Sequence, residues 1–129
     1  MSDLNDKFNE FTNTADHTGE IDAADIQANK VMAVLAYLGI LILIPIFGAK
    51  DSKFARFHAN QSLVLWVAVI VISLVLSILE KIPLIGTIAS IVSTLVSLAE
   101  LVFVVLGIVN ACNGKAKELP VIGGYRLLK

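Results

Sequence analysis

The sequence predicts an all-α fold: a polytopic helical membrane protein with three transmembrane helices, four being left open, and an acidic N-terminal tail. Three observations favour this class: 57% of the 129 residues are hydrophobic, only 16% are charged, and the charges are segregated. A soluble domain typically has about 45–50% apolar and about 25% charged residues. Seven of the eleven acidic residues lie within residues 1–27. The composition argues against a water-soluble enzyme, and the net charge of −1 predicts no nucleic-acid partner.

Residues 1–27 form the acidic tail. Four apolar residues recur in it at helical spacing, namely Leu4, Phe8, Phe11 and Ala15. This spacing would place them on one face of a short helix. Two alternatives stay open for this segment, a partly helical tail and a mobile one.

Three apolar segments are candidates for membrane spans. Residues 31–49 carry no charge, and as a helix they would measure about 28 Å, close to the roughly 30 Å of a bilayer core. Residues 62–79 are also uncharged, and in lipid such a segment must satisfy its own backbone hydrogen bonds, which favours a helix. With flanking residues, the membrane domain is expected at 28–114 and its spans at about 28–49, 61–80 and 84–113.

The last apolar segment is too long for one upright helix. From Ile82 to Gly114 only Glu100 is charged, and 33 residues of helix would measure about 50 Å. Either an interfacial or re-entrant piece at about 83–92 leads into one span, or Glu100 marks a break between two short spans.

The basic residues predict an orientation. Lys50, Lys53 and Arg56 lie between the first two predicted spans, and residues 115–129 form a basic tail. Because short cytoplasmic loops carry an excess of Lys and Arg, both segments are expected in the cytoplasm. Three spans achieve this if the N-terminus lies outside, whereas four spans do not.

Polar residues inside the last span are a candidate intramembrane site. Glu100 is the most conspicuous, since a carboxylate at mid-bilayer is costly. Ser97 and Ser90 fall on the same helical stripe, and Ser93 lies beside it. The functional hypothesis is a proton or ion relay. The alternative is a protonated Glu in a seam between helices or at a helix break near water.

No catalytic or metal-binding pattern stands out in the sequence. The single cysteine, Cys112, excludes an internal disulfide, and the two histidines have no second ligand at metal spacing. We therefore expect no catalytic residues, no bound cofactor, no metal site and no enzymatic activity.

All three prolines lie in similar pentapeptides. These are Ile44-Pro45-Ile46-Phe47-Gly48, Ile82-Pro83-Leu84-Ile85-Gly86 and Leu119-Pro120-Val121-Ile122-Gly123. Proline cannot donate a backbone hydrogen bond and glycine tolerates positive φ, so each is interpreted as an apolar corner at the membrane boundary.

Two motifs suggest a family. The stretch Phe54-Ala55-Arg56-Phe57-His58-Ala59-Asn60-Gln61-Ser62-Leu63 and the tail at 113–123 resemble small bacterial membrane proteins of unknown function related to the chloroplast import component Tic-twenty. The resemblance covers roughly residues 28–127. It implies a helical protein of three or four spans in the bacterial cytoplasmic (inner) membrane. For the plastid branch it also implies a part in preprotein import.

These motifs supply a candidate interaction platform. Arg56, His58 and Gln61 lie at the start of one helix, and a three-span topology puts the tail with Gly114 and Pro120 on the same side. We predict that loop and tail pack together as a polar platform for a partner. Plain anchoring of helix ends is the competing interpretation.

The function predicted from the sequence is that of a non-enzymatic membrane interaction or scaffold component, linked to protein translocation. The alternatives are a small transporter or channel that uses Glu100, and a holin-like pore former. The expected partners are the lipid bilayer and other membrane proteins, and a homo-oligomer stays open.

Overall fold

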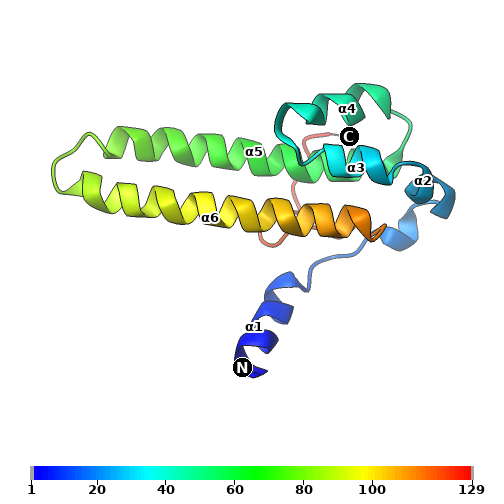
Figure 1. Ribbon diagram of the computed structural model, residues 1–129, viewed down its shortest axis with the longest axis horizontal. Helices are drawn as coiled ribbons and strands as arrows, with labels where there is room; N and C mark the ends of the chain where they lie inside the picture. Colours follow the sequence, from blue (N-terminus) through cyan, green and yellow to red (C-terminus); the bar gives the residue numbers. More distant parts are fainter. Residues whose placement is uncertain (1, 129) are drawn as a thin grey trace.

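The structure is a computed structural model that describes residues 2–128, and its regular structure is helical. Two long helices dominate it: α5 (Lys53–Leu79) and α6 (Ile85–Cys112) form an antiparallel hairpin closed by a short turn (Figure 1). Both are long and apolar enough to cross a membrane. Only 22% and 6% of their most apolar 18-residue windows are buried, unlike the core helix of a soluble protein. The all-α prediction is confirmed, with two candidate spans.

The first predicted span, 28–49, is not a transmembrane helix. Its residues form α3 (Lys30–Leu35), the 3-10 helix η2 (Gly39–Ile42) and α4 (Leu43–Gly48), which fold back on one another beside α5 (Figure 1). The chain reverses after Leu38, where Gly39 adopts a φ of +62°. Glycine enters this left-handed region without steric cost, so the helix ends there. Because the chain turns back on itself, we call residues 30–48 the re-entrant hairpin; among residues 2–128, α5 and α6 are the helices long and apolar enough to cross a membrane, and a third or fourth span is not shown.

The two long helices also differ from the predicted segments in detail. α5 begins at Lys53, eight residues before the predicted start at 61, because the Ser52 hydroxyl caps it by accepting a hydrogen bond from Ala55 N at 3.0 Å. α6 is continuous through Glu100. Neither an interfacial piece at 83–92 nor a break at Glu100 is present.

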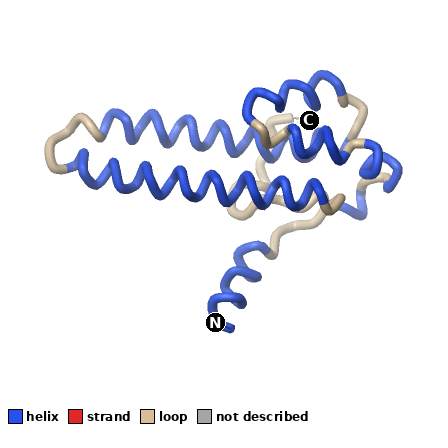
Figure 2. Tube along the Cα trace, in the orientation of Figure 1, coloured by secondary structure: helices blue, strands red, loops and turns tan. Residues whose placement is uncertain are grey.

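The N-terminal residues form short helices beside this core. They are α1 (Ser2–Thr12), the 3-10 helix η1 (Thr18–Glu20) and α2 (Ala23–Ala28), whose N-cap is Asp22. Asp16 forms an isolated antiparallel bridge with Lys117 of the C-terminal tail. The N-terminal segment and the tail therefore lie at the same end of the hairpin (Figure 2). If the hairpin crosses a membrane, these two segments lie on the same side of it, which disagrees with the predicted placement of the N-terminal segment outside and the tail in the cytoplasm.

Apart from α1, the molecule divides into two regions. The polar end consists of residues 13–66 and 106–128, and the arm is the rest of the α5–α6 hairpin, residues 67–105. Within the polar end, α3 approaches α6 closely at Gly107: a Cβ there would lie 2.2 Å from Cε1 of the buried Tyr37. The absence of a side chain at this position allows the re-entrant hairpin to pack on α6.

Candidate functional site

A buried histidine joins three segments of the polar end. His58, fully buried on α5, contacts the hydroxyl of Tyr37 through Nδ1 at 2.7 Å and the Lys115 carbonyl oxygen through Nε2 at 2.8 Å. A carbonyl only accepts, so Nε2 carries the proton and Nδ1 accepts from the tyrosine. The rings of Phe54 and Phe57 meet the imidazole edge to face. His58 thus links the end of α3, α5 and the tail.

The next polar side chain on α5 holds the end of the tail. Asn60 donates from Nδ2 to the Tyr125 carbonyl at 2.8 Å, and its Oδ1 accepts from Leu127 N at 2.6 Å and Leu128 N at 3.0 Å. The asparagine is 2% exposed. The Asn60 side-chain amide thus satisfies three backbone groups of the tail, the Tyr125 carbonyl and the N–H groups of Leu127 and Leu128.

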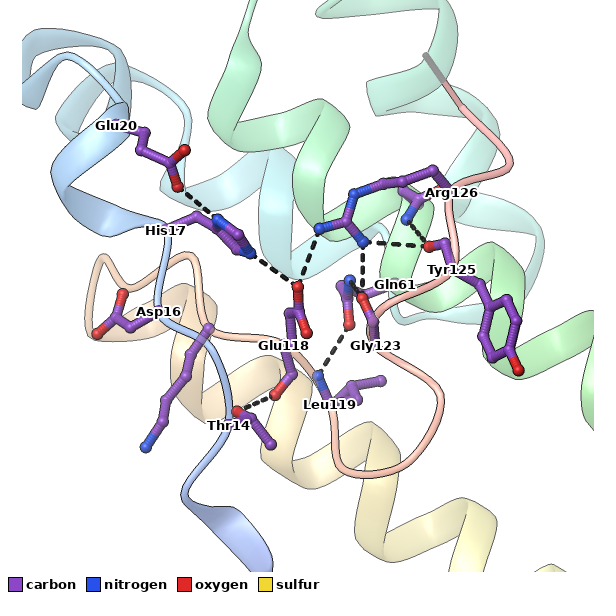
Figure 3. Close-up of polar contacts among 12 residues, drawn as sticks. Thr14, Asp16, His17, Glu20, Gln61, Glu118, Leu119, Gly123, Tyr125 and Arg126 are labelled. Carbon is purple, nitrogen blue, oxygen red and sulfur yellow. Dashed lines mark hydrogen bonds and ion pairs between the residues drawn. The ribbon is translucent and has the colours of Figure 1, made fainter.

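Gln61 does the same for the middle of the tail. Its Nε2 donates to the Gly123 carbonyl at 2.9 Å and its Oε1 accepts from Leu119 N at 2.8 Å (Figure 3). The side chain is fully buried. A buried backbone group without a partner is costly, so these bonds fix the path of the tail.

An ionic cluster ties the N-terminal segment to the tail (Figure 3). Nε2 of His17 lies 2.7 Å from the Glu118 carboxylate, which also accepts from Arg126 at 3.1 Å, and Nδ1 of His17 contacts Glu20. Thr14 donates its hydroxyl to the Glu118 carbonyl. The hydrogen bonds to Glu118 and then to Glu20 raise the pKa of His17 above its usual value.

A carboxylate closes the base of the re-entrant hairpin. Asp25 accepts from the Ser52 hydroxyl, from Phe54 N at 3.0 Å and from the Asn29 amide at 2.8 Å. Burial alone would raise the pKa of Asp25, but these hydrogen bonds outweigh it and hold the pKa below its usual range. Asp25 therefore connects the segment before α3 to the start of α5.

The structure brings most of the predicted platform residues together. His58 and Gln61 are buried against the tail, Gly114 and Pro120 are buried within it, and Arg56 is half-buried on the same turn of α5. Both polar atoms of Gln61 and Nε2 of His58 face the tail, whereas Nδ1 of His58 faces Tyr37. Whether a partner uses this region stays a prediction.

The predicted intramembrane site is not a single cluster. Glu100 is half-buried, whereas Ser90 and Ser97 are exposed on the arm. Ser93 donates to the Glu80 carboxylate at 2.9 Å, close to the turn between α5 and α6. Within residues 2–128, no group of three or more His, Cys, Asp or Glu side chains is placed to hold a metal ion.

Several residues of the polar end escaped the sequence reasoning. The sequence predicts no hydrogen bond from Asn60 or Tyr37 to another segment. It also does not predict the bonds of Asp25 to the start of α5, or the ion pair between His17 and Glu118 of the tail. One signal was present: Asn60, Gln61 and Ser62 are three consecutive polar residues at the head of an apolar helix. Such residues inside a helix need partners from another segment.

Comparisons with known proteins identify relatives. The magnetosome magnetite crystal formation protein family matches residues 28–128. Magnetosome protein MmsF of Paramagnetospirillum magneticum is 34% identical over 92 residues, which cover 71% of this chain and 79% of the relative. Magnetosome protein MamF of the same organism is 34% identical over 95 residues, covering 74% and 79%. MamF of Magnetospirillum gryphiswaldense is 47% identical over 36 residues, covering 28% and 32%. No solved structure matches the chain.

These matches overturn the predicted family, function and localisation. The resemblance to the Tic-twenty-like family is wrong, because a different family matches the same stretch of chain. The predicted role in a membrane scaffold linked to translocation is wrong, as are the transporter, channel and holin alternatives. The predicted localisation in the inner membrane is overturned as well, since the family and the relatives are described as magnetosome proteins. The motif around Asn60 and Gln61 holds the tail against α5, a structural role that is not specific to one function.

Proposed function

Because the chain belongs to the magnetosome magnetite crystal formation protein family, we propose that it is a membrane protein of the magnetosome that takes part in the formation of magnetite crystals. The observation that carries this proposal is the extent of the match. Residues 28–128 include α3, η2, α4, the whole α5–α6 hairpin and the tail. The matched part therefore contains both candidate spans and the segments packed on them, rather than one helix.

The structure supports a membrane role for this unit. The arm exposes large apolar side chains around both helices, for example Ile78 at 65% and Leu101 at 60%. Apolar area of this size is stable in lipid and costly in water. The proposal thus places the arm in the lipid of the magnetosome membrane, with the polar end and the turn at 80–84 at its two surfaces.

We further propose that the chain acts without a catalytic centre of its own. The support is that three buried polar side chains of α5 form hydrogen bonds within the protein itself. His58, Asn60 and Gln61 bond Tyr37 and backbone groups of the tail, so these donors and acceptors are engaged in the fold. In this proposal the effect on crystals comes from a folded surface held at the membrane.

The proposal is tested by complementation in Paramagnetospirillum magneticum. Two relatives occur in that organism, so the recipient strain should lack both MmsF and MamF. We expect this chain to be recovered with purified magnetosomes and to shift crystal size or shape toward the parental distribution, measured by electron microscopy. MmsF expressed from the same promoter is the positive control.

Two results would contradict the proposal. One is a protein that remains outside the magnetosome fraction while MmsF enters it. The other is a protein that reaches the magnetosomes at the level of MmsF and leaves the crystals unchanged. A chain carrying Ser97→Ala, on the exposed face of the arm, is expected to complement as the unchanged chain does.

A further inference from the structure

We propose that α1 lies on the bilayer surface beside α6, with its apolar face in the lipid and its acidic face in water. This helix precedes the residues that match the family, so the inference concerns a segment to which no role is assigned. It does not depend on the role in crystal formation.

The two faces of α1 are clearly separated. Leu4, Phe8 and Phe11 fall within about 60° of arc at 100° per residue, and all three are exposed, at 67%, 52% and 43%. The acidic residues Asp3, Asp6 and Glu10 cluster on another arc, centred about 130° away. A helix of this kind, amphipathic but not apolar overall, is typical of an interfacial position.

The apolar face of α1 continues the lipid-facing surface of the arm. The ring centroid of Phe11 lies 6.2 Å from that of Phe103 on α6. Ala99, one turn before Phe103 on the same face of α6, is exposed, and Val102, farther round the helix, is 46% exposed. The aromatic contact therefore joins the uncovered face of α1 to side chains that lie in lipid. We infer that one continuous lipid surface covers both.

The direction of α1 agrees with this position. Figure 1 shows α1 leaving the body of the protein and running steeply across the axis of the α5–α6 hairpin. If the hairpin axis follows the bilayer normal, a helix inclined steeply to that axis lies closer to the plane of the membrane than to its normal. The end of α1 also shares a hollow with the tail: Asn9, Glu10 and Thr12 line it together with Lys117. The polar side of α1 thus turns toward the tail.

The segment after α1 fixes the helix at this level. His17 N donates to the Ala116 carbonyl at 2.8 Å, and Glu118 N donates to the Ala15 carbonyl at 2.9 Å. Only a few residues separate these bonds from Thr12, the last residue of α1. The end of α1 therefore stays beside α6.

Site-directed spin labelling of the full chain in phosphatidylcholine vesicles tests the proposal. Cys112 is exposed and is replaced by Ser, and single labels are placed at Leu4, Phe8, Asp6 and Glu10. The collision rate of each spin label with oxygen reports its exposure to lipid, and the collision rate with a water-soluble nickel chelate reports its exposure to water. We expect labels at 4 and 8 to favour oxygen severalfold over labels at 6 and 10. Four nickel-accessible labels would overturn the proposal, and so would dipolar broadening between copies at positions 4 and 8.

A matched pair of substitutions makes the test sharper. With the label at Leu4, Phe8→Asp places a carboxylate on the apolar face, whereas Asn9→Asp adds the same charge on the polar face. We expect the first change to raise nickel accessibility at position 4 severalfold and the second to leave it unchanged. Equal effects of the two would mean that lipid does not hold this face.

Discussion

The polar end and the arm are built from the same two helices but are stabilised by different surroundings. At the polar end α5 presents His58, Asn60 and Gln61, all buried and bonded to another segment. A few turns farther along, the same helix exposes Ile70, Leu74 and Ile78, each more than half exposed. One region is thus ordered by specific hydrogen bonds, and the other relies on lipid to cover its side chains. Substitutions should therefore lower the free energy of unfolding strongly at the polar end and only slightly on the arm.

The largest contrast is expected at Gln61. Gln61→Ala leaves the buried Leu119 N–H without a partner, which costs about 1–3 kcal/mol, and removes one of the two donors to the Gly123 carbonyl, the other being Arg126. With about 0.5–1.5 kcal/mol for the second bond, we expect a loss of about 1.5–4.5 kcal/mol in unfolding by SDS in mixed micelles, together with faster tryptic cleavage after Lys117. Ser97→Ala on the arm should change stability by less than about 0.5 kcal/mol. Equal losses would remove the distinction between the two regions.

The next effect is expected where α3 crosses α6. Gly107→Ala places a Cβ 2.2 Å from the ring of Tyr37, which is buried and bonded to His58. Overpacking of this kind costs about 1–3 kcal/mol, and we expect the re-entrant hairpin to loosen from α6.

Gly48→Ala is the matched control for Gly107→Ala, because its Cβ would meet only the end of Met32 at 3.8 Å. Hydrogen exchange of α3 amides should increase in the first variant and not in the second. A Gly107→Ala protein with unchanged exchange would show that the crossing is not tight.

A smaller effect is expected at two turns, one in each region. Leu84 and Val121 follow the prolines of two of the pentapeptides and have φ values of 70° and 69°. Such strain costs of order 1–3 kcal/mol, and both side chains are more than 80% exposed, so Gly loses no packing there. We expect Leu84→Gly and Val121→Gly each to stabilise the protein by about 1 kcal/mol in the same SDS assay.

The pentapeptide at residues 44–48 provides the control for these two turns. Ile46 occupies the corresponding position, but it lies inside α4. Ile46→Gly should therefore destabilise by about 1 kcal/mol or more, since glycine weakens a helix interior. A gain in stability here would mean that the three pentapeptides share one conformation.

The smallest effect is expected from pH. The pKa of His17 is raised by Glu118 and Glu20, so its contact with the tail is fully stabilising below about pH 6.5 and weakens as pH rises through the raised pKa. The His17 side chain is 31% exposed, so we expect a loss of about 1 kcal/mol or less. Hydrogen exchange of the Glu118 amide between about pH 5.5 and 8.5, corrected for intrinsic rates, measures it. His17→Gln should abolish this dependence, and an exchange rate that slows with pH would contradict the sign.

The pentapeptides also show how far local sequence reasoning reaches. In two of them the backbone closes in the same way, with Gly86 N bonded to the Ile82 carbonyl and Gly123 N bonded to the Leu119 carbonyl. In the pentapeptide at residues 44–48, Pro45 lies in the first turn of α4, where proline is tolerated. The interpretation of all three as corners fails for this copy, because the preceding residues already run as a helix into it.

Length and hydropathy alone misjudged the segment at 31–49. A run of this length can span a bilayer or fold in half, and composition is the same in both cases. The reversal at Gly39 is stable because Tyr37 reaches His58, and because Asp25 and Ser52 close the base of the hairpin. Each of these contacts joins residues more than 20 positions apart, and no local pattern announces them.

The sequence by itself determined that this chain is helical and that its two longest apolar segments, α5 and α6, are suited to lipid, since a solvent without hydrogen-bonding groups demands both. Only the tertiary structure decided that the first apolar segment turns back, that the segment after α1 meets the tail, and that Asn60 and Gln61 hold the tail. The physical reason is that burial in lipid depends on how much apolar surface a segment carries, whereas a buried amide is stable only where a distant part of the chain supplies its partner.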